Sequence, residues 1–318
     1  QTYFQAMGGR YRYLSLPCRV DERPLPLVEV VDMRTQQDGQ GRTPLLSRPL
    51  IEALRETMEH RKQALLFLNR RGFHTFLFCP DCGHVFACPS CDLALTNHAA
   101  LGVLKCHHCD FTTKPPALCP ACGAGHIRSQ GAGTERAVEE TKKLFPEARI
   151  VRMDSDTTSR KGDTERILAK LDRQEIDILI GTQMITKGHD FPEITLVGVL
   201  AADASLNIPD FRASERTFQI LTQVSGRGGR GDQRGRVVVQ TFNPGHYAIR
   251  RAQDHDYAGY YEDELPIRRE LGYPPFSRLI GIHFSGLKQT EGKRAVTDIR
   301  KRIRELAATT PGGKVDVI

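Results

Sequence analysis

The amino-acid sequence predicts an α/β fold, in which a parallel β-sheet is covered by helices and interrupted by a cysteine-rich insertion. Two observations support this prediction. Short apolar runs typical of buried strands alternate with amphipathic stretches of about ten to fifteen residues, which is the pattern of a parallel sheet with helical crossovers. Eight of the nine cysteines lie between Cys79 and Cys122, directly after the first apolar run of this series.

The expected elements of the sheet follow one another along the chain. Residues 47–62 have helical periodicity with Ser47 as N-cap, and residues 64–69 form an apolar run expected to be a strand buried on both faces. After the cysteines, helices are expected at 134–144, 160–171 and 214–224, and strands at 148–153, 176–181, 195–201 and 235–241. Residues 1–45 lack clear periodicity apart from a strand-like run at 27–31.

The two ends of the chain are expected to lie outside this sheet. The turn-forming residues 243–245 and the pair Pro274-Pro275 mark the passage to another unit. There, a strand at 279–283, a helix at 291–308 and a strand at 315–318 would form a β-α-β piece. The sequence thus predicts a linker over 1–45, a sheet domain over 46–250 with an insertion at 76–126, and the start of a truncated α+β domain over 251–318.

The clustered cysteines form four Cys-x-x-Cys pairs, which are Cys79/Cys82, Cys88/Cys91, Cys106/Cys109 and Cys119/Cys122. Four such pairs supply the ligands of two tetrahedral zinc ions with no thiolate left over. A disulfide framework is the alternative, but such frameworks are typical of small secreted domains, and this chain has 318 residues. Because four thiolates leave no open coordination position, the predicted zinc ions are structural and not catalytic.

The spacing of the pairs indicates how the ligands divide. Only five residues separate Cys82 from Cys88, too few for a ribbon hairpin to bring these pairs around one ion, whereas fourteen separate Cys91 from Cys106. A glycine follows each outer pair and tolerates the left-handed backbone that turns amides toward the thiolates. The expected arrangement is therefore nested. One zinc ion takes Cys79, Cys82, Cys119 and Cys122, and the other takes Cys88, Cys91, Cys106 and Cys109, with His107 and His108 as alternative ligands.

The charge balance is compatible with nucleic-acid binding. Lys and Arg outnumber Asp and Glu by 45 to 38, which gives a formal net charge of +7. Two Zn²⁺ ions bound by eight thiolates subtract four charges and leave about +3, so local motifs have to carry any such binding. The longest apolar run, residues 194–202, is too short to span a bilayer, and no membrane partner is expected. Cys18 stands apart and is expected to be an inert buried thiol.

Two glycine-rich motifs follow expected elements of the sheet. Residues 181–192 (Gly-Thr-Gln-Met-Ile-Thr-Lys-Gly-His-Asp-Phe-Pro) come after a buried strand, and residues 223–230 (Gln-Val-Ser-Gly-Arg-Gly-Gly-Arg) come at the end of a helix. In the second motif, glycines flank Arg227 and Arg230, which lets guanidinium groups and backbone amides approach a polyphosphate. Either motif alone is compatible with a solvated turn, but their order and spacing together favour a functional site.

These motifs resemble motifs V and VI in the second RecA-like lobe of superfamily 2 helicases. With the eight cysteines inserted in that lobe, the chain resembles the primosomal protein N′ (PriA) family of replication-restart helicases. The resemblance implies an ATP-driven helicase that moves 3′ to 5′ along DNA and assembles the primosome at stalled forks. It also implies forked and single-stranded DNA, primosome proteins, the single-stranded DNA-binding protein and the replicative helicase as partners, and a cytoplasmic, nucleoid-associated location in bacteria.

The same resemblance assigns roles to single residues. In the catalytic motif, Arg230 would be the arginine finger at the γ-phosphate of ATP, Arg227 would reach the same phosphate and Gln223 would orient the motif. The residues expected beside the nucleotide are Asp190, Gly188, Gly226 and Gly229. The residues expected to contact the phosphates of the DNA are Asn69, Arg70, Arg71, Thr182 and Gln183.

One departure limits the resemblance. The 318 residues contain no Gly-x-x-x-x-Gly-Lys-[Ser/Thr] phosphate loop and no Asp-Glu-x-His string. Residues 1–45 would then link to a first lobe that the chain lacks, and the chain would hold half of an ATP site. ATP and Mg²⁺ would be bound by the full-length protein, and the isolated chain would be inactive.

The alternative function is a non-enzymatic zinc-ribbon adaptor that binds single-stranded DNA or primosome proteins. The rings of Phe76, Phe78 and Phe86 lie beside the cysteines in the sequence. They would form a wedge or docking surface, or they would pack the small zinc-bound core.

Overall fold

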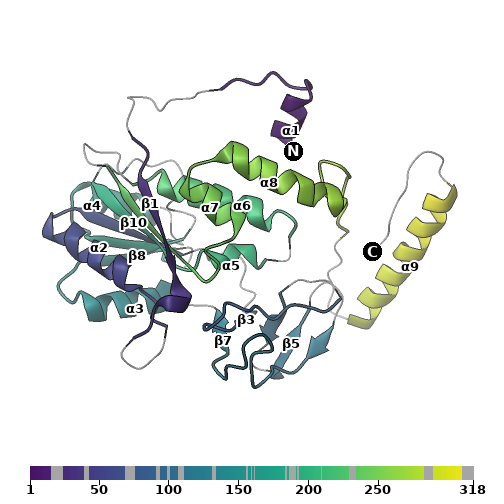
Figure 1. The fold of residues 1–318 in the computed structure, drawn as a ribbon, viewed down its shortest axis with the longest axis horizontal. Coiled ribbons are helices and arrows are strands. Elements are labelled where there is room, and N and C mark those ends of the chain that lie inside the picture. Colours follow the sequence, from purple (N-terminus) through teal and green to yellow (C-terminus); the bar gives the residue numbers. More distant parts are fainter. Residues whose placement is uncertain are drawn as a thin grey trace. The chain divides into compact units, whose positions relative to one another are not determined.

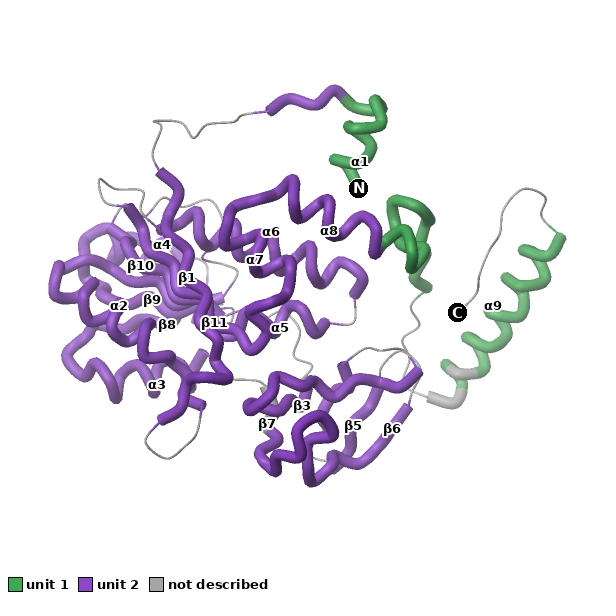
Figure 2. The backbone as a smooth tube through the Cα atoms, viewed as in Figure 1, with its two compact units in different colours: residues 1–11, 268–318 green, residues 12–267 purple. Residues whose placement is uncertain are grey.

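The computed structural model of the protein (Figure 1) describes residues 1–15, 24–38, 43–68, 76–90, 94–98, 101–106, 111–130, 134–154, 157–158, 160, 162–182, 185, 191, 193–208, 210–228, 234–282 and 289–309. The chain divides into two compact units, as Figure 2 shows. One consists of Arg12–Ile267, and the other combines Gln1–Tyr11 with Arg268–Ile318.

The larger unit is built on a six-stranded sheet. Its strand order is β1-β11-β10-β2-β9-β8, and every neighbouring pair is parallel. The strands are β1 (Leu27–Asp32), β2 (Gln63–Phe67), β8 (Ile150–Met153), β9 (Ile178–Gly181), β10 (Ile194–Val199) and β11 (Arg236–Thr241). All residues of β2 and β9 are buried, as expected for interior strands of a parallel sheet with two covered faces.

Helices cover both faces of this sheet, and β2 contributes alternate side chains to the two hydrophobic clusters between them (Figure 1). Helices α2 (Arg48–Glu59) and α3 (Thr134–Leu144) pack on one face with Leu66. Helices α4 (Asp163–Asp172), α6 (Ala213–Ser225) and α7 (Tyr247–Gln253) pack on the other face with Leu65. The short α5 (Asp203–Leu206) follows β10, and α8 (Tyr257–Glu270) follows α7.

Helix α2 shows how local sequence and packing agree. Ser47 is its N-cap: the side-chain oxygen accepts a hydrogen bond from the backbone N–H of Leu50 at 3.4 Å. Gly198 of β10 lies beneath the helix, where a Cβ atom would come within 2.7 Å of Leu66 and 2.8 Å of Leu50. Only glycine therefore allows the helix to approach the sheet this closely.

The cysteine-rich insertion between β2 and α3 forms a second sheet, which is antiparallel. Its order is β6-β5-β4-β3-β7, with β3 (Phe76–Phe78), β4 (Thr96–His98), β5 (Val103–Lys105), β6 (Thr112–Thr113) and β7 (Arg128–Gln130). A small separate core supports it, made of Leu77, Phe86, Cys88, Leu95, Leu104 and Cys106. The insertion thus has its own core and does not extend the parallel sheet.

The elements expected between residues 47 and 241 are confirmed, with ends that differ by a few residues. The strand-like run at 27–31 is β1, which lies at the edge of the sheet and pairs with β11 over six residues. A short 3₁₀ turn, η2 (Met33–Thr35), follows it. Helices α7 and α8 were not expected from the sequence.

In the smaller unit the expected helix is confirmed as α9 (Gln289–Thr309), and a short helix, α1 (Thr2–Met7), lies at the other end of the chain. The expected strand at 279–283 is wrong over residues 279–282, which form no strand and leave Ile280 88% exposed. The expected strand at 315–318 lies outside the described residues, as does His283. Among the described residues, no helix combines the length and apolarity needed to cross a membrane.

Candidate metal centre and sheet edges

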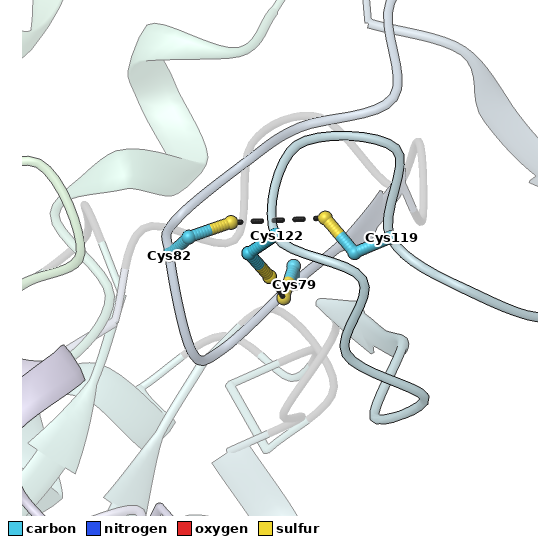
Figure 3. A group of neighbouring side chains, drawn as sticks. All are labelled: Cys79, Cys82, Cys119 and Cys122. Carbon is cyan, nitrogen blue, oxygen red and sulfur yellow. Dashed lines mark hydrogen bonds between the residues drawn. The ribbon is translucent and has the colours of Figure 1, made fainter.

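Two loops of the insertion bring four cysteines together, as Figure 3 shows. The Sγ atoms of Cys79 and Cys122 lie 3.6 Å apart, and those of Cys82 and Cys119 lie 3.7 Å apart. All four sulfurs lie within 4.8 Å of one another, and none is in a disulfide. The outer set predicted from spacing is therefore assembled in space.

The two loops share one backbone geometry. The N–H of Gly83 donates to the carbonyl of Cys79 at 2.9 Å, and the N–H of Gly123 donates to that of Cys119 at 2.8 Å. Gly83 and Gly123 have φ angles of +77° and +76°. The left-handed turn predicted after each outer pair is confirmed, and such turns direct backbone amides toward the thiolates.

The distances fit a tetrahedral zinc ion. Zinc about 2.3 Å from each sulfur places the sulfurs of a tetrahedron about 3.8 Å apart, close to the 3.6 and 3.7 Å between the two pairs of thiols. Zinc bound here would have four thiolate ligands and no open position for a substrate, so its role would be to hold the two loops together.

The ionisation of the four thiols depends on a cation. Burial raises the pKa of Cys79, and it raises the pKa of Cys82 to about 12. Burial also acts to raise the pKa of Cys119, but the backbone N–H groups of Ala121 and Cys122 outweigh it and lower this pKa to about 7. Four thiols at this separation do not ionise together without a cation, and bound zinc supplies that charge.

The predicted inner site is only partly described. Cys88 and Cys106 are both buried in the core of the insertion, and the N–H of Cys106 donates to the carbonyl of Phe111 at 2.8 Å. Cys91, Cys109, His107 and His108 lie outside the described residues, as does Cys18. The inner zinc site stays a prediction.

The three aromatic residues beside the cysteines are buried. Phe76, Phe78 and Phe86 are 4%, 7% and 6% exposed. Phe86 belongs to the core of the insertion, and Phe78 packs on the ring of Phe242. These burials favour the packing role over an exposed wedge for each ring.

One of the residues predicted to contact DNA, Thr182, is described, and it lies at an edge of the parallel sheet. Strands β2 and β9 are neighbours, and the N–H of Leu68 donates to the carbonyl of Gly181 at 2.8 Å, where both strands end. Thr182 lies at this carboxyl edge and is 8% exposed. Asn69, Arg70, Arg71 and Gln183 lie outside the described residues, although the chain order attaches them to the same strand ends.

The described residues of the predicted catalytic motif lie at the end of α6 and not at the carboxyl edge of the sheet. Gln223 lies on the last turn of α6 and is exposed, Gly226 ends this helix, and Arg227 is half-buried. A Cβ on Gly228 would lie 3.4 Å from Cγ2 of Val197 and 3.8 Å from the carbonyl oxygen of Arg236, the first residue of β11. This motif therefore packs toward the amino end of β11. Arg230, Gly229, Gly188 and Asp190 lie outside the described residues.

Two buried carboxylates in the sheet unit were missed by the sequence-based reasoning. Asp154 follows β8 and accepts hydrogen bonds from Thr134 Oγ1 at 2.5 Å and from the N–H of Thr157 at 3.1 Å. Asp203 begins α5 and accepts hydrogen bonds from Thr241 Oγ1 at 2.6 Å and from the N–H of Phe242 at 2.8 Å. The available signal was an Asp at or just beyond the end of a predicted strand, which is the edge where such sheets place functional groups.

Comparison with known proteins agrees with this architecture. The PriA DNA helicase Cys-rich region (CRR) domain matches residues 88–114, and the helicase conserved C-terminal domain matches residues 132–232. The replication restart protein PriA of Bacillus subtilis is 48% identical over 93% of this chain and 36% of that protein. The replication restart protein PriA of Synechocystis is 44% identical over 94% of this chain and 36% of that protein. The chain thus spans about a third of the length of these relatives.

Among solved structures, yeast Dbp5 bound to RNA and ADP BeF3 aligns with 85% of this chain and 51% of its own, at 11% identity and a TM-score of 0.37. The parallel sheet covered on both faces, with four cysteines converging in an insertion after β2, defines a helicase C-terminal domain that carries a zinc-ribbon region. The chain belongs to the PriA family of replication restart proteins.

Proposed function

We propose that this chain is the second motor lobe of an ATP-dependent 3′-5′ DNA helicase that restarts replication at stalled forks and assembles the primosome. The observation that carries the proposal is the four-thiolate cluster inserted between β2 and α3 of a helicase C-terminal domain. Relatives that are named replication restart protein PriA support it. Its partners would be forked and single-stranded DNA, the single-stranded DNA-binding protein, other primosome proteins and the replicative helicase, in the bacterial cytoplasm at the nucleoid.

The lobe would face nucleotide and DNA with different parts of its sheet. Arg227 and Arg230 would approach the γ-phosphate of ATP, with Gln223, Gly226, Gly229, Gly188 and Asp190 around them. Thr182, Gln183, Asn69, Arg70 and Arg71 would hold DNA phosphates at the carboxyl edge. Because Gly228 packs toward the amino end of β11 and Thr182 lies at the carboxyl edge, the sheet between them connects the two functions.

Two zinc ions would be structural parts of this lobe. The outer ion would be held by Cys79, Cys82, Cys119 and Cys122, whose sulfurs already converge. The inner ion would be held by Cys88, Cys91, Cys106 and Cys109. ATP and Mg²⁺ would be bound together with a part of the protein that contains a phosphate loop, because the sequence of this chain contains none.

The sharpest test replaces the proposed arginine finger in the complete protein. Arg230→Ala should lower the kcat of DNA-stimulated ATP hydrolysis by about 10³-fold or more, because the transition-state charge on the γ-phosphate loses its partner. DNA affinity should change little. Arg234→Ala is the matched control, because it removes an exposed arginine four residues further along the chain. The Nε atom of Arg234 donates to the carbonyl of Leu25 at 2.9 Å. Wild-type turnover in Arg230→Ala, or an equal loss in both variants, would contradict the assignment.

The second candidate function is a non-enzymatic zinc-ribbon adaptor for single-stranded DNA or primosome proteins. The absence of a phosphate loop from the sequence favours it for the isolated chain. The 318-residue chain alone is then expected to bind DNA without hydrolysing ATP. Sustained ATP turnover by this chain would contradict both the adaptor function and the assignment of only half an ATP site to this chain.

A further inference from the structure

The outer cysteine cluster, defined by Cys79, Cys82, Cys119 and Cys122, contacts the parallel sheet through Gly83. A Cβ built on Gly83 would lie 2.9 Å from the carbonyl oxygen of Phe242 and 3.6 Å from Cδ of Arg34. Phe242 directly follows β11, and Arg34 lies in the turn after β1. The loop that carries Cys79 and Cys82 therefore packs against the carboxyl ends of two neighbouring strands.

A contact between two rings extends this interface. Phe78 immediately precedes Cys79 and packs edge-on against Phe242, with ring centroids 4.7 Å apart and an interplanar angle of 62°. Phe78 is 7% exposed, so the contact keeps water away from the first cysteine of the cluster.

Phe242 is itself held in place by a buried carboxylate. Asp203 is 4% exposed, and it accepts hydrogen bonds from the hydroxyl of Thr241 at 2.6 Å and from the N–H of Phe242 at 2.8 Å. Because Asp203 begins α5, it joins the end of β11 to the connection that leaves β10. These two hydrogen bonds fix the backbone at Phe242 where Gly83 meets it.

Arg34 brings a positive charge to the same interface. Its Nε and Nη2 donate to the carboxylate of Asp32 at 2.8 and 2.6 Å, which orients the guanidinium. Hydrogen bonding to Asp32 raises the pKa of Arg34. Four thiolates around one Zn²⁺ carry a net charge of about −2, which a neighbouring guanidinium offsets.

We propose that the loop of the outer zinc centre docks on a site formed by Arg34, Phe242 and Asp203. A zinc ion bound in this centre then orders the ends of β1 and β11 as well as the cysteine-rich insertion. Zinc fixes the turn at Gly83 that fits over the Phe242 carbonyl, and Arg34 offsets the charge of the centre. Zinc binding and order at these strand ends are coupled in both directions. The inference requires that the cluster binds zinc, and it does not depend on helicase activity.

Gly123 provides a matched control for Gly83. It follows Cys122 as Gly83 follows Cys82, and its φ angle is +76° against +77°, but a Cβ on Gly123 would meet nothing within 4 Å. Gly83→Ala and Gly123→Ala therefore introduce the same backbone strain beside the same ion, and only Gly83→Ala also collides with Phe242.

The test uses the zinc-loaded 318-residue chain. Gly83→Ala should release one zinc ion to a chelator about tenfold faster than Gly123→Ala does, on the scale seen when partners of metal ligands are lost. Amide hydrogen exchange over residues 240–243 should rise in Gly83→Ala alone. Equal effects of the two substitutions on both measurements would overturn the proposal.

A second set of variants covers the case in which Gly83→Ala does not fold. Arg34→Ala should speed the release of one zinc ion, whereas Arg48→Ala should not, because Arg48 is an exposed residue of α2 that pairs with Glu52 of the same helix. Conversely, Cys122→Ser should raise exchange over residues 240–243, and Cys88→Ser should not. Wild-type zinc release in Arg34→Ala, or unchanged exchange in Cys122→Ser, would overturn the proposal.

Discussion

The side chain of Asp154 is fully buried at the carboxyl end of β8, where neighbours from three segments balance its charge. Thr134 donates from the start of α3, Thr157 donates from the following turn, and Nε of Arg152 lies 3.3 Å from the carboxylate. Burial acts to raise the pKa of Asp154, but the hydrogen bonds from Thr134 and Thr157 and the charge of Arg152 lower it below its ordinary value of 3.8. This carboxylate thus ties α3 to the edge where DNA is proposed to bind.

The first prediction follows from the sign of this pKa shift. A carboxyl whose pKa is lower in the folded state stabilises the fold above its unfolded pKa, and this contribution is lost as the pH falls through the folded pKa. Asp154→Asn should therefore lower the free energy of unfolding by about 1–3 kcal/mol at pH 7, because a buried donor loses its acceptor. The difference from wild type should shrink below about pH 4. Urea denaturation between pH 7 and pH 3 measures it, and a pH-independent difference would contradict the assignment.

At the scale of residues, sequence reasoning predicted the cysteines, which have a regular spacing, and missed the two buried aspartates, which have none. Cys79, Cys82, Cys119 and Cys122 were predicted because each pair has the spacing of two ligands for one ion, and the sulfurs do meet. Asp154 and Asp203 have no such spacing. Their roles arise from the fold, which brings Thr134 to Asp154 and Thr241 to Asp203 across long stretches of sequence.

The second prediction concerns the count of zinc ions. Native mass spectrometry of the chain should give two zinc ions, because eight thiolates divide into two complete tetrahedral sets. Cys79→Ser should lose one ion and keep the other, since the nested sets share no ligand. Although Cys18 is expected to be buried, thiol-blocking reagents should modify it first in the loaded protein, because zinc would hold the other eight thiolates. A single zinc ion in the wild type, or loss of both ions from Cys79→Ser, would contradict the nested arrangement.

At the scale of elements, α8 supports α6, the helix that leads to the proposed catalytic motif. Phe218 of α6 stacks on Tyr260 of α8, with ring centroids 4.4 Å apart and planes at 20°. Tyr247 of α7 stacks on Tyr260 in turn, and its hydroxyl donates to Glu264 at 2.5 Å. Helix α6, whose last turn carries Gln223, is therefore held by the aromatic rings of α7 and α8.

The third prediction tests this support. Phe218→Ala should lower the free energy of unfolding by about 3–5 kcal/mol, because a large buried ring is removed. In the complete protein it should also lower ATP turnover, since α6 would no longer hold Arg227 in one position. Leu168→Ala on α4 removes a buried side chain from the same hydrophobic cluster and should cost stability only. If both variants lose turnover equally, the effect is general destabilisation and not loss of support for α6.

The elements that sequence patterns predicted and those they missed differ in a physical way. Interior strands such as β9 are uniformly apolar because both of their faces are covered, and this composition is visible in the sequence. Helix α8 has weak amphipathicity and contains Pro266, which argues locally against a helix. Its Tyr260 is buried by packing on Phe218 of α6 and Tyr247 of α7, a tertiary effect that no local pattern carries. The edge position of β1 is likewise set by pairing with β11.

At the scale of the whole sheet unit, charges at opposite edges should differ in their effect on DNA. In the sequence, Arg70 comes three residues after Phe67, the last residue of β2, whereas Arg61 is exposed just before β2 begins, at the amino edge. Both arginines flank the same strand in the sequence. A comparison of the two variants therefore distinguishes the effect of where a charge lies from the general effect of losing one positive charge. Parallel strands place functional groups at their carboxyl ends.

The last prediction uses this pair to locate the DNA. In the 318-residue chain, Arg70→Gln should weaken binding to single-stranded DNA and reduce the slope of log K against log salt by about one, because one phosphate contact and its released counterion are lost. Arg61→Gln should leave the slope unchanged, since its charge lies at the other edge. Base composition of the DNA should matter little for either variant. If Arg70→Gln keeps the wild-type slope while its fold is intact, DNA does not pass the carboxyl edge, and the surface of the cysteine-rich insertion becomes the place to look for it.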